Sequence, residues 1–288
     1  MLTFRVLLSV ACAQAGGAIA RALFGTIGPY GVLLLRLSIA ALIFAIAIRP
    51  RVRSWPLPAW RAAILLGVFS AGLNALSYLA LNLAPQGIVV TASFVGPLVL
   101  SLAQTRRPVD ALWALMAFGG VALLGLRTGT DVPLPGLLLA LGAGACGAGY
   151  ILCSARVGSV VPGLGGLAVS FGVAAVLILP FGAGQAGRAF TDARLIAGVV
   201  AVAVLSSVVP YAVELTVLRS MSTRVFGVLM SLQPAAAAVA GWLILGQRLG
   251  WVPIAALVLV TLASAGVTRS AGQRGERADT YAADGVDR

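Results

Sequence analysis

Two ionisable side chains lie inside long apolar runs of the sequence, and they are the first candidates for chemistry. Glu214 stands in VVPYAVELTVL and Arg36 in LLLRLSIAA. A charge in membrane hydrocarbon costs at least about 2.5 kcal/mol, so a side chain kept there is a functional candidate. Glu214 either binds a substrate ammonium group or carries a coupling proton, or it forms a structural ion pair with Arg36 or bonds to nearby backbone. Arg36 either attracts a substrate carboxylate, snorkels, or ties two helices together.

Uncharged polar side chains in neighbouring apolar runs extend this candidate site. Any one of them alone is better explained by a hydrogen bond between helices than by contact with a ligand. As a group they occupy runs one, three, four, six, eight and nine, which predicts a shared polar interior. The residues expected to line it with Glu214 are Gln14, Asn74, Ser77, Tyr78, Ser93, Tyr150, Tyr211 and Gln233.

The residue types that are missing exclude several kinds of site. Without lysine the chain cannot form a phosphate-binding loop ending in Gly-Lys-Ser/Thr, and without histidine it has no imidazole for a metal, a triad or a proton relay. Cys12, Cys146 and Cys153 fall inside apolar runs without metal-site spacing, so we expect them to be packing residues. A lone Glu214 does not supply the residue cluster of an intramembrane enzyme. We expect no enzymatic activity, no cofactor and no metal.

Long apolar runs must position these residues. Hydrophobic residues make up 60% of the 288 positions and charged residues 10%, with a mean hydropathy of +1.03. Because roughly 20 apolar residues span a bilayer, we predict an all-α membrane protein of ten transmembrane helices. The runs are 4–24, 30–48, 62–82, 84–104, 109–126, 136–155, 162–181, 194–218, 224–245 and 250–268.

The arginines between the runs indicate the orientation. The net charge is +12, but the basic residues are dispersed and do not predict nucleic-acid binding. With the N-terminus in the cytoplasm, 14 of the 20 arginines lie in inner segments and five in outer ones. This asymmetry favours a bacterial inner-membrane protein with both termini cytoplasmic. The first run is too long for a cleaved signal peptide, and residues 269–288 are predicted to be a disordered tail.

The runs divide into two sets of five, in residues 1–127 and 136–268. An odd number of helices in each half requires that two similar halves sit inverted in the membrane, as in many transporters. Pro97 and Pro234 stand in mid-run, 137 residues apart, and the same offset pairs Ser70 with Ser207 and Ser77 with Glu214. The matched prolines predict hinges or broken helices beside a cavity; the alternative is that they only bend their helices.

Several segments, in conserved order, resemble the EamA-type transporters of the drug/metabolite transporter superfamily, and among them the subgroup that exports threonine and homoserine. The similarity extends from about residue 14 to 265. The segments are QAGGAIARALF, AGLNALSYLAL, FVGPL with RRPVD, LALGAGAC with YILCSARVG, and PYAVEL with STRVFGVLMSLQPAAAAVAG.

The resemblance implies two inverted five-helix repeats around a central cavity, and proton-driven export of amino acids such as threonine and homoserine. Carried over by position, Gln14, Asn74, Tyr150, Tyr211 and Glu214 match the polar pattern of the family. Three further positions, acidic in the resembled exporters, are neutral in this chain: Ser93, Gln233 and Gln247. Either Glu214 alone serves coupling, or the protein is an uncoupled facilitator or a broader drug/metabolite efflux transporter. The expected partners are a small-molecule substrate, the lipid bilayer and protons.

Overall fold

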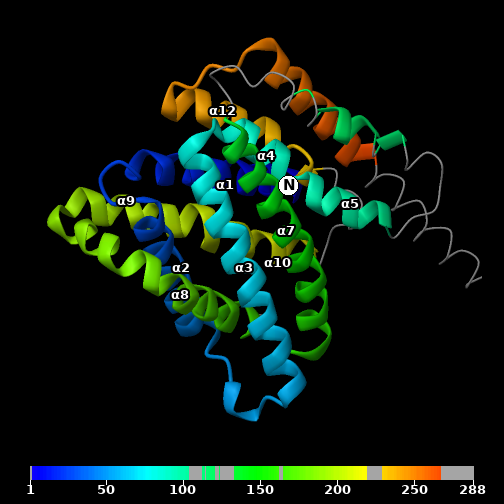
Figure 1. Ribbon diagram of the computed structural model, residues 1–288. Coiled ribbons are helices and arrows are strands. Elements are labelled where there is room, and N and C mark those ends of the chain that lie inside the picture. The colour runs from blue at the N-terminus through cyan, green and yellow to red at the C-terminus, as the bar shows by residue number, and fades with distance from the viewer. Residues whose placement is uncertain are drawn as a thin grey trace, which may run out of the picture.

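The structure is a computed structural model that describes residues 2–103, 112–113, 115–120, 123, 133–161, 165–218 and 229–266 (Figure 1). For residues 101–102 and 214–218 it describes the backbone only. Every regular element within these ranges is a helix, in agreement with the all-helical membrane class. The predicted tail 269–288 and most of the connection between the predicted halves lie outside the described residues.

Six helices in the described ranges are long and apolar enough to cross a membrane. The sixth begins as α9, continues through a π-helical segment, η3 (Val204–Val208), and ends as α10 (Val209–Leu218). The first five begin and end within five residues of the predicted limits. The six are α1 (Leu2–Leu23), α2 (Pro29–Ile48), α3 (Leu57–Leu83), α7 (Leu134–Val160), α8 (Gly165–Ala186) and the helix that starts with α9 (Ala193–Ala203).

Shorter helices occupy the other predicted runs. They are α4 (Gln86–Ser93), α5 (Val95–Ala103), α12 (Gln233–Leu245) and a helix at Trp251–Gly266, with short 3-10 turns η1 (Val52–Ser54) and η2 (Gly187–Thr191). The runs 109–126 and 224–245 are only partly described.

Local chemistry explains two of the helix ends. Asp192 accepts the backbone N–H of Arg194 at 2.8 Å and caps α9, and Gly246 ends α12 with a left-handed φ of 65°.

The run 84–104 differs from its prediction as one helix, because it is interrupted at Phe94, between α4 and α5. Pro97 has no N–H to donate to the carbonyl of Ser93, so a regular turn cannot continue there. A similar turn at Ser231 precedes α12 and Pro234. Both matched prolines therefore follow an interruption of a helix. Their role as hinges stays a prediction.

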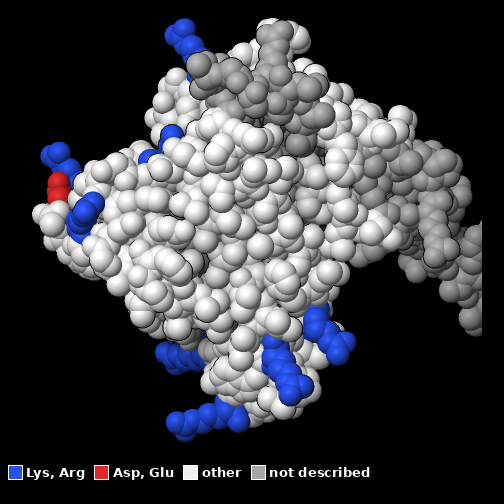
Figure 2. Space-filling model, viewed as in Figure 1, with Lys and Arg blue, Asp and Glu red and all other residues white. Residues whose placement is uncertain are grey.

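The helices pack in a bundle whose members come from distant parts of the sequence (Figure 1). α3 runs along α7 and α8, α2 runs along α8, and α1 lies against α12, η3 and α10. Figure 2 shows charged side chains at the ends of the molecule and a broad uncharged surface between them. Large apolar side chains such as Phe4, Phe181 and Trp242 are 59–70% exposed on the outside, which is favourable against lipid and unfavourable in water.

The closest helix crossing described is made by two glycines, Gly96 of α5 and Gly144 of α7. A Cβ on Gly96 would overlap the carbonyl of Gly144, and a Cβ on Gly144 would lie 2.5 Å from the Ser93 carbonyl oxygen. Small residues at such crossings let two backbones approach in a membrane. The crossing fixes α7 against the interruption between α4 and α5.

We expect Gly144→Ala to destabilise the protein by about 1–3 kcal/mol, because the added methyl group overpacks a backbone contact. Unfolding in mixed micelles titrated with SDS would measure the change. Gly158→Ala is the matched control on the same helix, since a Cβ there meets open space, and it should be neutral or slightly stabilising. Equal effects of the two substitutions would contradict the close crossing.

Candidate functional site

Arg36 lies inside the bundle and is only 9% exposed, although it carries a charge. Its Nε donates to the hydroxyl of Ser207 at 3.0 Å. Its Nη1 donates to Asn74 Oδ1 at 3.0 Å and to the Tyr78 hydroxyl at 3.1 Å. Its Nη2 donates to the Ser206 carbonyl at a longer 3.4 Å. We call these five residues the Arg36 cluster.

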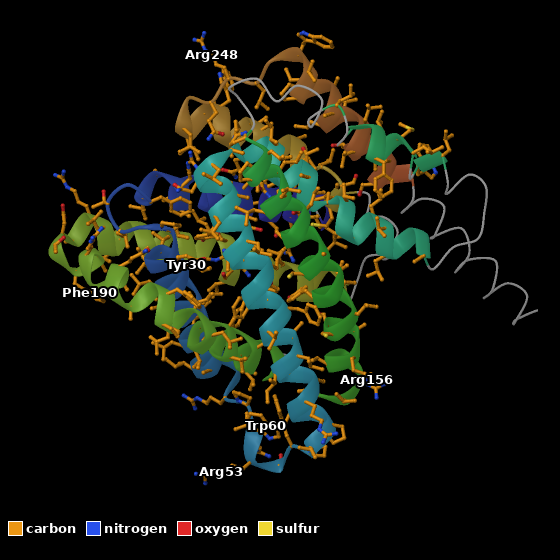
Figure 3. All side chains as sticks on the ribbon, viewed as in Figure 1. Tyr30, Arg53, Trp60, Arg156, Phe190 and Arg248 are labelled. Atoms are coloured by element: carbon orange, nitrogen blue, oxygen red, sulfur yellow. The ribbon has the colours of Figure 1, made fainter. Side chains whose placement is uncertain are left out.

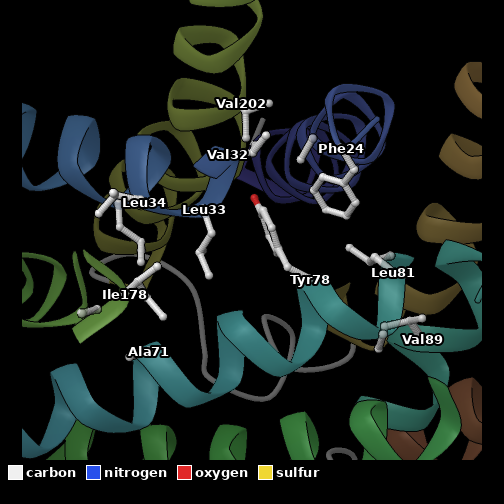
Figure 4. Packing of buried hydrophobic residues seen from close by; sticks show 14 of the residues in the cluster. Phe24, Val32, Leu33, Leu34, Ala71, Tyr78, Leu81, Val89, Ile178 and Val202 are labelled. Carbon is white, nitrogen blue, oxygen red and sulfur yellow. The ribbon is translucent and has the colours of Figure 1, made fainter. Parts of the chain in front are cut away.

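Helix α3 presents two of the acceptors from one face, because Asn74 and Tyr78 are four residues apart. Asn74 Nδ2 donates to the Ser70 carbonyl at 2.8 Å, which turns its Oδ1 toward the guanidinium. The Tyr78 ring lies under the same group, with the Arg36 Cζ 5.6 Å from the ring centroid. Figure 4 shows Tyr78 rising from α3 between Leu33 and Phe24, with its hydroxyl pointing toward neighbouring helices.

The other two acceptors belong to η3, where the helix is locally π-helical. The N–H of Val209 bonds to the carbonyl of Val204, five residues before it. In a regular α-helix the Ser206 carbonyl would accept from residue 210, and Pro210 has no N–H to donate. The wider turn presents both the Ser206 carbonyl and the Ser207 hydroxyl to Arg36. Single-turn π segments of this kind are found frequently at functional sites.

The cluster agrees with the interpretation in which Arg36 ties helices together, since its bonds join α2, α3 and η3. Among the described residues all its acceptors are neutral. Glu214 lies on α10, seven residues after Ser207, but its side chain is outside the described residues. Its pairing with Arg36 and its role in binding or coupling stay predictions.

A second pair of predicted residues also comes together. The Tyr150 hydroxyl of α7 donates to the Tyr211 hydroxyl of α10 at 3.1 Å. The Tyr211 ring meets Phe171 and Phe44 edge to face, with centroids 5.3 and 6.2 Å away. Both tyrosines are only partly buried. The hydroxyl pair thus joins two helices next to a compact aromatic group.

Gln14 belongs to a third group, which is centred on Gln86 at the start of α4. Gln86 Nε2 donates to the Gln14 carbonyl at 2.8 Å and to Gln14 Oε1 at 3.2 Å. The Gln86 N–H donates to Gln247 Oε1 at 3.0 Å. Gln86 is 1% exposed, whereas Gln247 is only half-buried, so this tie between α1, α4 and the segment after α12 is enclosed at Gln86 and Gln14 and partly open at Gln247.

Three predicted residues, Ser77, Ser93 and Gln233, join none of these groups, and Ser77 is half-buried on α3. The Ser93 hydroxyl bonds to the carbonyls of Val89 and Ala140, at 2.8 and 3.1 Å. Gln233 begins α12 and donates to the sulfur of Met230 at 3.2 Å. Both contacts can be explained as local packing, and a role for these residues in binding stays a prediction.

Sequence reasoning missed Gln86, Ser206 and the role of Ser207. Ser207 carried one signal, its offset of 137 residues from Ser70, which was noted only as a sign of a repeat. Gln86 follows Pro85 at the edge of an apolar run, where a polar residue usually marks the end of a helix. The residue type of Ser206 does not indicate that its backbone carbonyl is available to a side chain. Only Pro210, four residues later, indicates it, because proline has no N–H to donate to that carbonyl.

Comparison with known proteins adds independent support for a transporter. Residues 134–269 match the model of the EamA-like transporter family. The chain is 39% identical over 266 residues to the threonine/homoserine exporter RhtA of Salmonella typhimurium SL1344 and to that of Escherichia coli K12. These alignments cover 91% of this chain and 90% of each relative. A solved crystal structure at 19% identity superposes with a TM-score of 0.62 over 96% of this chain and 97% of the other, which supports the fold.

We expect Tyr78→Phe to destabilise the protein by about 0.5–2 kcal/mol, because it removes one acceptor from a buried cation. Unfolding in SDS-titrated mixed micelles would measure the loss. Tyr30→Phe is the matched control on α2, because the Tyr30 hydroxyl has no recorded partner in the described part of the chain and its ring still stacks on Phe181. A loss as large in the control would contradict the bond from Arg36.

Proposed function

Because the chain belongs to the EamA-like transporter family, we propose that it is an inner-membrane secondary transporter that exports small polar metabolites, with amino acids such as threonine and homoserine as substrates. One observation carries the proposal: 39% identity over 91% of the chain to the exporter RhtA. The buried and half-buried polar groups at Arg36, at Tyr150 and at Gln86 agree with it, because a polar solute crossing a membrane protein needs such partners.

We further propose ten membrane spans arranged as two inverted five-helix repeats, residues 1–127 and 136–268. The packing supports this arrangement, because α1 and α7, the first helices of the two halves, contact corresponding helices of the opposite half. α1 packs against α12, and α7 packs against α4. α1 also packs against η3 and α10, and α7 packs against α3. The interruptions before Pro97 and Pro234 fall at equivalent positions in this scheme.

The proposed orientation places both termini in the cytoplasm. Arg53 and Arg156 lie at one end of the molecule and Arg248 at the opposite end (Figure 3). The N-terminal part of α3 packs with the C-terminal part of α7 at the first end, which brings together segments expected on the inside. The positive-inside bias assigns this end to the cytoplasm.

Transport by alternating access fits the placement of the three polar groups. The Gln86 tie lies near the end of α12, toward Arg248, and Tyr150 lies on the part of α7 nearer Arg156. The Arg36 cluster connects the proposed halves between them. We propose that substrate passes Arg36, with the Gln86 tie closing the outer end.

Purified protein in liposomes should accelerate the efflux of L-threonine and L-homoserine over protein-free liposomes. Radiolabelled flux, with and without a pH gradient, tests this directly. If both amino acids leave the liposomes no faster than from protein-free liposomes, they are rejected as substrates. If the flux is the same with and without the pH gradient, the result favours an uncoupled facilitator. This is the alternative suggested by the neutral residues Ser93, Gln233 and Gln247.

We expect Glu214→Gln to abolish the acceleration of flux by a pH gradient while the protein still folds, because the amide cannot carry a proton. Asp192→Asn is the matched control, since Asp192 is exposed and asparagine keeps its helix cap. The control should keep the dependence on the gradient. If Glu214→Gln keeps the full dependence of flux on the pH gradient, the Glu214 carboxyl does not carry the coupling proton.

A further inference from the structure

We propose that Arg36 binds the carboxylate of the transported solute, an inference that rests on the proposed function and adds to it the group that recognises the substrate. The recorded acceptors of this guanidinium in the described residues are two hydroxyls, one amide oxygen and one backbone carbonyl. These groups satisfy hydrogen bonds, and none of them carries a negative charge. A solute carboxylate would neutralise the positive charge of the guanidinium.

Energetics favour an anion at this place. A buried cation in a membrane protein is costly, and neutral dipoles offset only part of that cost. Arginine binds carboxylates with short, charge-assisted hydrogen bonds. A carboxylate that reaches Arg36 therefore gains a charge-assisted hydrogen bond and the attraction of the guanidinium charge.

The geometry leaves one nitrogen of the guanidinium, Nη2, less committed than the others. Of its five N–H groups, one on Nε and two on Nη1 are held by Ser207, Asn74 and Tyr78 at 3.0–3.1 Å. Nη2 makes a single bond of 3.4 Å to the Ser206 carbonyl, and its second N–H has no recorded acceptor among the described residues. The group is thus fixed in orientation, with Nη2 least committed, which is the preorganisation that a binding site needs.

Binding at Nη2 would also act on the tie between the halves. The Ser206 carbonyl belongs to η3 of the second half, whereas Asn74 and Tyr78 belong to the first. A carboxylate oxygen at Nη2 competes with the Ser206 carbonyl and leaves the bonds to Asn74, Tyr78 and Ser207 in place. Substrate binding would therefore keep Arg36 on α3 and remove one of its two bonds to η3.

Binding to the full-length protein in nanodiscs tests the assignment without any transport step. The probes are L-homoserine, its amino alcohol (in which CH2OH replaces the carboxylate) and 4-hydroxybutyrate (in which the ammonium group is missing). We expect the amino alcohol to bind roughly ten- to a hundredfold more weakly than L-homoserine, as expected for the loss of hydrogen bonds to a charged group.

Arg36→Gln should bring the ratio of these two affinities close to one. The ratio is insensitive to the folded fraction of the sample, so partial misfolding does not imitate the result. Arg21→Gln is the matched control, because Arg21 is also a partly buried arginine of a spanning helix but lies outside the Arg36 cluster. It should keep the ratio of the native protein.

The outcomes separate the two proposals. If L-homoserine and its amino alcohol bind equally well to the native protein, Arg36 does not bind the carboxylate, whereas amino-acid export stands. If 4-hydroxybutyrate binds and L-homoserine does not, the amino-acid proposal fails and the carboxylate site stands. If no carboxylate probe binds, or if Arg36→Gln keeps the native ratio, the assignment is overturned.

Discussion

A buried guanidinium constrains the helices around it, because water cannot supply acceptors for its N–H groups inside a membrane protein. Arg36 meets this requirement with acceptors from α3 and η3. Loss of either of these segments would leave a donor of the guanidinium unpaired. One side chain, Arg36, therefore holds α2, α3 and η3 in their relative positions. The other polar contacts, at Gln86 and at Tyr150, lie on either side of Arg36.

Prolines provide part of what this side chain needs. In hydrocarbon the backbone is normally fully paired within each helix, so a carbonyl that loses its helical donor is readily available to a side chain. Pro210 removes the donor for the Ser206 carbonyl, which accepts from Arg36 instead. Pro97 likewise removes the donor for the Ser93 carbonyl, and the helix is interrupted at Phe94. Prolines thus account for both helix irregularities and for one of the contacts of Arg36.

Hydropathy predicted most of the helices, because the length of α1, α2, α3, α7 and α8 is set by the thickness of a bilayer. It did not predict the interruption at Phe94 or the π-helical turn of η3, since apolar composition is the same on both sides of each. Arg36, Asn74 and Tyr78 were each recognisable as polar residues in apolar runs. Their grouping was not, because it depends on how α2, α3 and η3 cross. Gln86 and the Ser206 carbonyl were missed because one resembles a helix boundary and the other is backbone.

Two of the ties between the proposed halves, at Gln86 and at Arg36, differ in the energy needed to separate them. The bond from the Gln86 N–H to Gln247 joins neutral groups, and such bonds between membrane helices contribute about 0.6 kcal/mol on average. The bonds from Arg36 to Ser206 and Ser207 involve a cation, whose acceptors cannot be withdrawn without a larger cost. Thermal motion can open the Gln86 tie by itself, whereas the Arg36 tie loosens readily only when another acceptor takes the place of the Ser206 carbonyl. In an alternating-access cycle the neutral amides would therefore bias the end that is proposed to face outward toward closure, and the occupancy of Arg36 would decide when the halves can move.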